Sequence, residues 1–147
     1  MSWARKARPD IACYGRREAA GMLEHAKMIT DVKNHLSTSL GLPDELLGEF
    51  VDSFMSSFDK TAEELKPFAE GPESPMPDWM EIRRITHTVK GYSDGVGAAD
   101  LRALSDALNA AAHAQDAAAC RAGAKAIRDL HARYAAERAA DGGASNG

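Results

Sequence analysis

The stretch that decides the fold is residues 43–71, PDELLGEFVDSFMSSFDKTAEELKPFAEG. Its apolar residues recur at i, i+3 or i+4, and i+7, which is the spacing of one face of an α-helix. Seven residues form this stripe: Leu47, Phe50, Val51, Phe54, Phe58, Ala62 and Leu65. Pro43 suits the first helical turn, where its missing N–H is not needed. The stretch therefore predicts one long amphipathic helix with one face in a core.

The opposite face of the same helix is acidic. It carries Glu45, Glu49, Asp52, Asp59, Glu63 and Glu64. Carboxylates are rarely buried without a partner, so we expect this face to be mainly solvated.

A shorter amphipathic helix precedes this stretch. Its apolar residues are Met22, Ile29, Val32, Leu36 and Leu40. The helix is predicted to stop at Gly41, with Pro43 just beyond, because glycine followed by proline is a common helix end.

Three more helices are predicted downstream of the proline-rich breaker GPESPMP, residues 71–77. Asp78 offers an N-cap and Glu81 its capping-box partner for a helix that ends near Gly95 and Gly97. The next helix has an inner face of Leu101, Leu104, Leu108 and Ala111 or Ala112. Asp116 caps the last helix, whose inner face holds Cys120, Ala124, Ile127, Leu130 and Tyr134.

No run alternates with the period of a β-strand, and short loops join successive helices. The predicted fold is therefore all-α, an up-and-down antiparallel four-helix bundle with an additional N-terminal helix. We expect the bundle to span residues 21–137. Residues 1–20, basic and unpatterned, are expected to form a mobile arm, and the glycine-rich residues 138–147 a disordered tail.

The overall composition limits the classes of partner. At 147 residues the chain suits one domain, and its net charge of -4 argues against nucleic acid. No apolar run approaches the ~20 residues that span a bilayer, and no secretory signal opens the chain. Cys13 and Cys120 lack disulfide or C-x-x-C spacing. We expect a cytoplasmic monomer, and the opening Met and polar ends favour a free-standing protein over part of a larger kinase.

One histidine of the predicted third helix is expected to face solvent. With Ile82 as the origin of a helical wheel, Ile85, Val89 and Val96 place the buried stripe near about 320°. His87 falls at about 140°, on the opposite side. The outer half of the helix also holds Arg83, Arg84, Lys90, Gly91 and Asp94. His87 is therefore predicted to stand in the open among cations.

These residue types suit the holding of a phosphoryl group. An exposed imidazole titrates near ~6.5, so it is mostly uncharged at neutral pH and can act as a nucleophile. Lys90 lies on the next turn, within reach of the phosphoryl oxygens. A glycine inside a helix costs roughly 1 kcal/mol relative to alanine, so Gly91 indicates a need for close approach by a partner. No G-x-x-x-x-G-K-[ST] loop is present to bind ATP, which favours a carrier over a kinase.

At these residues the sequence resembles a known family. His87 to Gly91, HTVKG, matches the H-x-x-K-G signature of histidine-containing phosphotransfer (HPt) domains, and YSDGVGAADLRAL resembles the family's continuation. A looser resemblance extends from about Ile29 to about Tyr134. It implies a phosphorelay intermediate of two-component signal transduction. His87 would accept a phosphoryl group from the aspartate of a receiver domain and pass it to another receiver.

The resemblance also implies roles for the neighbouring residues and partners. Lys90 would steady the phosphate, Gly91 would clear room for docking, and Arg83, Arg84 and Asp94 would lie on the docking face for the receiver. A hybrid sensor histidine kinase and response regulators would be the partners. Mg²⁺ would belong to the receiver, so this chain is expected to have no cofactor and no metal site.

One residue departs from the family pattern, and two other functions remain open. Tyr92 stands where the family usually has a small residue; we expect its ring to pack while its hydroxyl reaches outward. The main alternative is an interaction module that binds a receiver or kinase without carrying phosphate. The other is a metal site drawn from His25, His35, His113, His131 and the two cysteines, which lack H-E-x-x-H spacing. His131 is interpreted as a hydrogen-bonded residue at the edge of the core.

Overall fold

The computed structural model describes residues 28–71 and 78–146, with side chains up to residue 140. Over these residues the chain forms helices only. They are α2 (Met28–Thr38), α3 (Asp44–Glu70), α4 (Trp79–Val96), α5 (Ala99–His113) and α6 (Ala117–Asn146). The expected arm at residues 1–20 and most of the proline-rich breaker, residues 72–77, lie outside the described residues.

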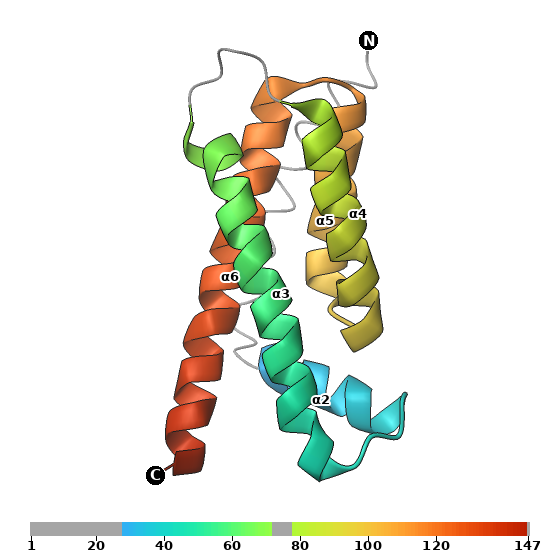
Figure 1. Cartoon of the computed structure of the whole chain (residues 1–147), viewed down its shortest axis with the longest axis vertical. Helices are drawn as coiled ribbons and strands as arrows, with labels where there is room; N and C mark the ends of the chain where they lie inside the picture. The colour runs from blue at the N-terminus through green and yellow to red at the C-terminus, as the bar shows by residue number, and fades with distance from the viewer. Residues whose placement is uncertain (1–27, 72–77, 147) are drawn as a thin grey trace.

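Helices α3 to α6 form the predicted antiparallel four-helix bundle (Figure 1). Each of the four packs against the next, and α6 returns to lie along α3. The additional helix α2 crosses the lower end of the bundle in Figure 1, where it contacts α3, α4 and α6. The predicted fold class is confirmed.

The core of the bundle is built from the predicted apolar stripes. Phe54, Phe58 and Tyr134 pack as an aromatic cluster between α3 and α6, with ring centroids 5.4 to 5.7 Å apart. Two members of the predicted stripes are instead exposed: Phe50 at 43% and Leu40 at 55%. Phe50 lies about 75° from the centre of the buried stripe of α3, and Leu40 follows the end of α2 and no longer keeps its period.

The acidic face of α3 is mainly exposed, as expected, since all of its six carboxylate residues except Glu64 are exposed. Three of these carboxylates, together with Glu70 at the end of α3, contact basic side chains of α4 and α6. The pairs are Asp52–Arg138, Asp59–His131, Glu64–Arg84 and Glu70–Arg128. The sequence alone could not pair these groups, because the partners come from helices 20 or more residues further along the chain. His131 is hydrogen-bonded at the edge of the core, as expected, with Nε2 2.5 Å from the Asp59 carboxylate.

Helix α6 extends past the predicted end of the bundle at residue 137. The tail expected to be disordered from residue 138 is helical to Asn146. Its first residue, Arg138, contacts Asp52 of α3. The preceding Glu137 accepts hydrogen bonds of 2.8 Å from the N–H groups of Met28 and Ile29. The contacts of Glu137 and Arg138 and the alanine-rich sequence before them favour helix up to this point, and the glycines that follow have low helix propensity.

The helix caps of α4 and α6 follow the prediction in part. Asp78 and Asp116 accept hydrogen bonds of 3.1 Å from the N–H groups of Glu81 and Ala119. The Glu81 carboxylate, expected to return to Asp78, binds Arg84 instead. Gly97 ends α4 in the left-handed conformation, with φ 69°. A Cβ at this position would also overlap the ring of His35 from α2, so both its conformation and its surroundings require glycine.

Candidate functional site

The outer face of α4 carries the predicted site residues. His87, Lys90, Gly91 and Arg83 are exposed, whereas Ile82, Ile85 and Val89 on the inner face are fully buried. The orientation predicted for His87 is therefore confirmed. The inner apolar positions fix the rotation of α4 about its axis, and this rotation places the imidazole in solvent.

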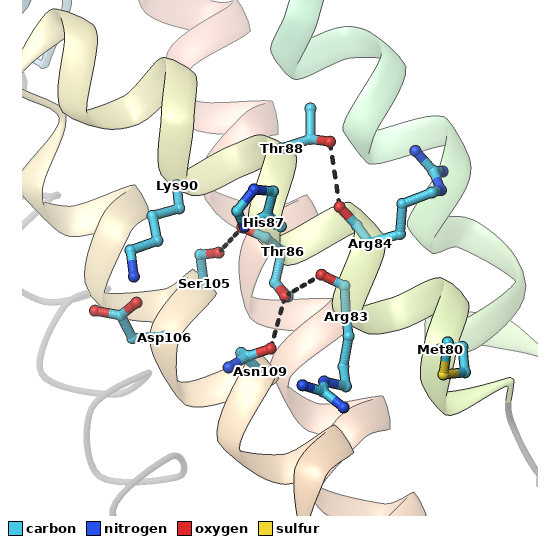
Figure 2. Close-up of a pocket in the computed structure, with 10 residues that line it drawn as sticks. All are labelled: Met80, Arg83, Arg84, Thr86, His87, Thr88, Lys90, Ser105, Asp106 and Asn109. Atoms are coloured by element: carbon cyan, nitrogen blue, oxygen red, sulfur yellow. Dashed lines mark hydrogen bonds between the residues drawn. The ribbon is translucent and has the colours of Figure 1, made fainter.

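A groove of about 530 Å³ runs beside His87, between α4 and α5. Arg83, His87 and Lys90 of α4 border it, and Ser105, Asp106 and Asn109 of α5 line its other side (Figure 2). The α5 residues were not among the predicted site residues. A signal was present, because Ser105 and Asn109 directly follow the core residues Leu104 and Leu108 and so lie beside the buried stripe.

A small polar network holds the two helices together beneath His87. The hydroxyl of Thr86 is shared between the carbonyl of Arg83, at 2.9 Å, and the amide oxygen of Asn109, at 3.1 Å. The hydroxyl of Ser105 donates to the carbonyl of Thr86, at 3.1 Å. Thr86 and Ser105 are both buried. These bonds fix the backbone that carries His87 relative to α5.

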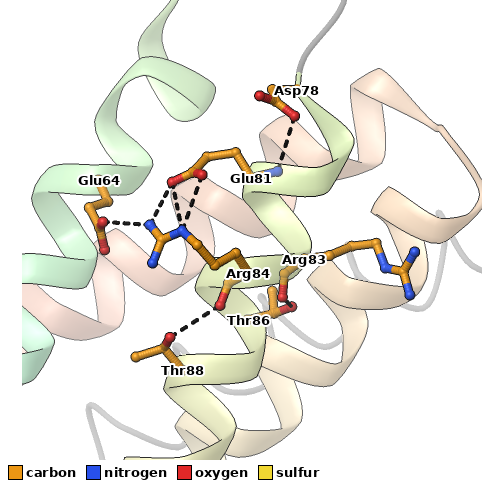
Figure 3. A network of polar contacts seen from close by, with 7 residues as sticks. All are labelled: Glu64, Asp78, Glu81, Arg83, Arg84, Thr86 and Thr88. Carbon is orange, nitrogen blue, oxygen red and sulfur yellow. Dashed lines mark hydrogen bonds and ion pairs between the residues drawn. The ribbon is translucent and has the colours of Figure 1, made fainter.

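The cations around His87 fall into two groups. Among the described residues, Lys90 and Arg83 have no ion-pair or hydrogen-bond partner for their side chains, and Figure 2 shows Lys90 extending beside the groove. Arg84 binds two carboxylates, with Nη2 2.7 Å from Glu64 and 2.5 Å from Glu81 (Figure 3). These hydrogen bonds, first to Glu81 and then to Glu64, raise the pKa of Arg84 well above its usual value. Two of the three cations nearest His87 are thus available to an incoming anion.

Asp94, the remaining residue of the predicted docking face, also has an internal partner. Its carboxylate contacts Arg102 of α5, and Arg102 Nε lies 3.2 Å from both oxygens of Asp106. Arg84 and Asp94 therefore join α4 to its neighbours, while Arg83 presents a guanidinium without a partner in the described part of the chain. Of the three residues predicted for the docking face, Arg83 is therefore the one whose side chain is available to a receiver.

Gly91 is exposed one turn after His87. A Cβ built at this position would have no atom within 4 Å. Packing inside the protein therefore gives no reason for glycine here, although glycine lowers helix stability. A side chain at this position would extend into open space.

The family comparison agrees with this geometry. The model of the Hpt domain matches residues 45–137. The chain belongs to the Hpt family. Hpt domains are phosphocarrier modules of two-component phosphorelays, not kinases, and they interact with response-regulator receivers. No curated protein and no solved structure gave a significant match.

Tyr92 of this Hpt domain lies at the edge of the core, as expected, but its hydroxyl does not reach outward. The hydroxyl is hydrogen-bonded to the Thr61 hydroxyl of α3, at 2.7 Å. The ring meets Phe54 edge-on, with centroids 5.8 Å apart. Burial raises the pKa of Tyr92 to about 12. The large residue at this position therefore joins α3 to α4, and the expectation about its hydroxyl was wrong.

The residues considered for a metal site are dispersed in the Hpt structure. In residues 28–71 and 78–146, no group of three or more histidine, cysteine or acidic side chains could hold a metal ion. Cys120 is buried, and this burial raises the pKa of its thiol to about 12. His25 and Cys13 lie outside the described residues. None of the described helices has the length and apolar character needed to cross a bilayer.

Proposed function

We propose that this protein is a phosphorelay intermediate in which His87 carries the phosphoryl group. It accepts the group from the aspartate of one receiver domain and passes it to the receiver of another response regulator. The observation that carries the proposal is the exposed imidazole of His87 on α4, in a chain that belongs to the Hpt family. Beside it lies Lys90, whose ammonium has no ion pair with any described residue.

The transfer requires little chemistry from this chain. The lone pair of the unprotonated ring nitrogen of His87 attacks phosphorus. The bond from phosphorus to the aspartyl oxygen breaks as the nitrogen–phosphorus bond forms, and the aspartate leaves as a carboxylate. The proton on the other ring nitrogen stays there during the transfer. Onward transfer is the reverse process with a second receiver.

Charge and access explain the neighbouring residues. The phosphoryl group brings about two negative charges, and the Lys90 ammonium offers one compensating charge without breaking an internal ion pair. Gly91 leaves space for the receiver to bring its aspartate in line with the ring. Arg83 extends the positive surface on which the receiver docks. The receiver supplies Mg²⁺, so this chain needs no cofactor of its own. In this proposal the chain acts as a monomer, and a hybrid sensor histidine kinase is the upstream donor.

The test is a transfer assay with a receiver phosphorylated in advance. Acid-labile label should move to the wild-type protein and be absent from His87→Gln. His113→Gln, which changes another exposed histidine at the end of α5, is the matched control and should be labelled like the wild type. Equal labelling of His87→Gln and wild type would contradict the proposal. Receiver binding without any label on wild type would favour the alternative, an interaction module that carries no phosphate.

A further inference from the structure

The groove beside His87 contains a carboxylate that the proposed transfer does not use. Resting on the proposed function, we propose that Asp106 is a positioning residue for Lys90. It competes with the phosphoryl group for the Lys90 ammonium, and so determines how readily His87 gives the phosphoryl group up.

The first observation is the position of Asp106. Among the described residues that line the groove it is the single acidic side chain, and the others carry cationic, hydroxyl, amide, imidazole or thioether groups. Lys90 and Asp106 lie on opposite sides of the groove, and the ammonium of Lys90 points toward the carboxylate (Figure 2). The two groups are not in ion-pair contact. Lys90 is therefore attracted across the groove without being fixed there.

The second observation is that Asp106 is held and Lys90 is not. Arg102 Nε lies 3.2 Å from both carboxylate oxygens of Asp106, and the same guanidinium contacts Asp94 on α4. Lys90 has an exposed, flexible four-carbon stem. Of the two charges that face each other, the lysine is the one that can move. A phosphoryl group on His87 would have to draw Lys90 away from a fixed anion.

The consequence is a weaker hold on the phosphoryl group. Because Lys90 must leave Asp106 to approach the phosphoryl oxygens, the net electrostatic free energy gained by that approach is smaller. The negative charge of Asp106 also repels the phosphoryl oxygens directly. Both effects raise the free energy of the phosphorylated state. When a receiver docks, breaking the nitrogen–phosphorus bond and forming the aspartyl phosphate returns Lys90 to Asp106. The carboxylate therefore favours onward transfer over retention.

The experiment measures how label divides between His87 and a receiver aspartate at equilibrium. Asp106→Asn keeps the shape and an oxygen for Arg102 while removing the charge. We expect it to raise the ratio of phosphohistidine to aspartyl phosphate by about threefold, the scale of an exposed charge pair. The matched control is Asp129→Asn, the same change at an exposed position of α6, which should leave the ratio unchanged.

A double-mutant cycle then asks whether Asp106 acts through Lys90. In a Lys90→Ala background the effect of Asp106→Asn should fall to less than half. An unchanged or lowered ratio in Asp106→Asn would overturn the inference, as would an equal effect in both backgrounds. Asp106→Ala should reproduce the result, and equal thermal midpoints for wild type and Asp106→Asn exclude a loss of folding. If wild type takes up no label, the proposed function itself fails, which this assay shows before any variant is compared.

Discussion

The two sides of α4 carry similar residues and use them differently. On the side facing α3, Arg84 binds Glu64 and Glu81, and Tyr92 is hydrogen-bonded to Thr61. On the side bordering the groove with α5, Arg83 and Lys90 have no partner among the described residues. The polar groups of the first side are held by partners. The second side also packs on α5, through the hydrogen bonds of Thr86 and Ser105, but two of its cations have no partner in the described part of the chain.

The difference between the two sides shows how one helix can serve both as scaffold and as binding surface, depending on which of its side chains already have partners. A cation already held by two carboxylates offers little net attraction to a new anion, because the existing contacts must weaken first. A cation without a direct ion pair keeps more of its attraction for an incoming anion. The cations of α4 that have no ion pair with a described residue lie beside His87, so the distribution of partners, more than the count of basic residues, marks the candidate site.

The largest expected effect concerns Lys90. Lys90→Ala should slow phosphoryl transfer to His87 by about tenfold or more, because the transition state loses a compensating charge. Receiver binding should change much less. Rapid-quench transfer kinetics and a separate binding titration measure the two quantities. A transfer rate equal to that of wild type would show that Lys90 has no part in the reaction.

Gly91 allows function and stability to be separated. Gly91→Gln should lower transfer several-fold by obstructing the receiver, while raising helix stability by about 0.5 kcal/mol, since a Cβ meets no atom there. The matched control is Gly48→Gln, at a helical glycine of α3 that also has empty space around it. This variant should gain similar stability and transfer normally. Loss of stability in Gly91→Gln would mean that glycine is needed by the fold.

The neighbouring arginines test the comparison directly. Arg84→Ala should lower the thermal midpoint, because it removes the contacts that join α4 to α3 and to its own first turn, and it should leave transfer nearly unchanged. Arg83→Ala should do the opposite, weakening receiver binding with an unchanged midpoint. Thermal unfolding and receiver titration on both variants provide the measurement. Identical behaviour of the two variants would remove the distinction between the sides of α4.

The smallest expected effect is the alkaline response of Tyr92. Its folded-state pKa of about 12 lies above the usual 10, so the neutral phenol stabilises the fold fully below pH 10. This contribution is lost as pH rises from 10 to 12, because the unfolded chain ionises first. Tyr92→Phe also loses the Thr61 hydrogen bond and should be less stable at pH 7. The stability gap between wild type and Tyr92→Phe should therefore narrow from pH 10 to 12 in denaturant titrations, and a constant gap would contradict the assignment.

Local patterns in the sequence predicted most of the fold and the direction of His87. The stripe of Ile82, Ile85 and Val89 sets the rotation of α4, and Asp78 and Asp116 begin their helices as expected. These features depend on residues within a few turns of each other. For this reason they can be predicted without knowledge of the neighbouring helices.

The partners of polar side chains were not predictable in the same way. Arg84 and Asp94 are exposed, as expected, yet each also has a partner on another helix. The Tyr92 hydroxyl was expected to reach outward and is instead hydrogen-bonded to Thr61. Whether a group near the edge of a stripe meets solvent or a neighbour depends on the axial position of the adjacent helix, which periodicity does not contain.

The packing of His35 against Gly97 limits how far the chain can be shortened without disturbing the helix that carries His87. Helix α2 precedes the matched Hpt region, yet His35 covers the turn that ends α4, and Met28, Ile29, Val32 and Leu36 are buried. Trimming the chain to residues 45–137 would uncover that apolar surface and release the end of the helix that carries His87. The packed unit therefore includes α2 and is larger than the region that matches the Hpt family. If this module were moved into another signalling protein, α2 would have to be moved with it.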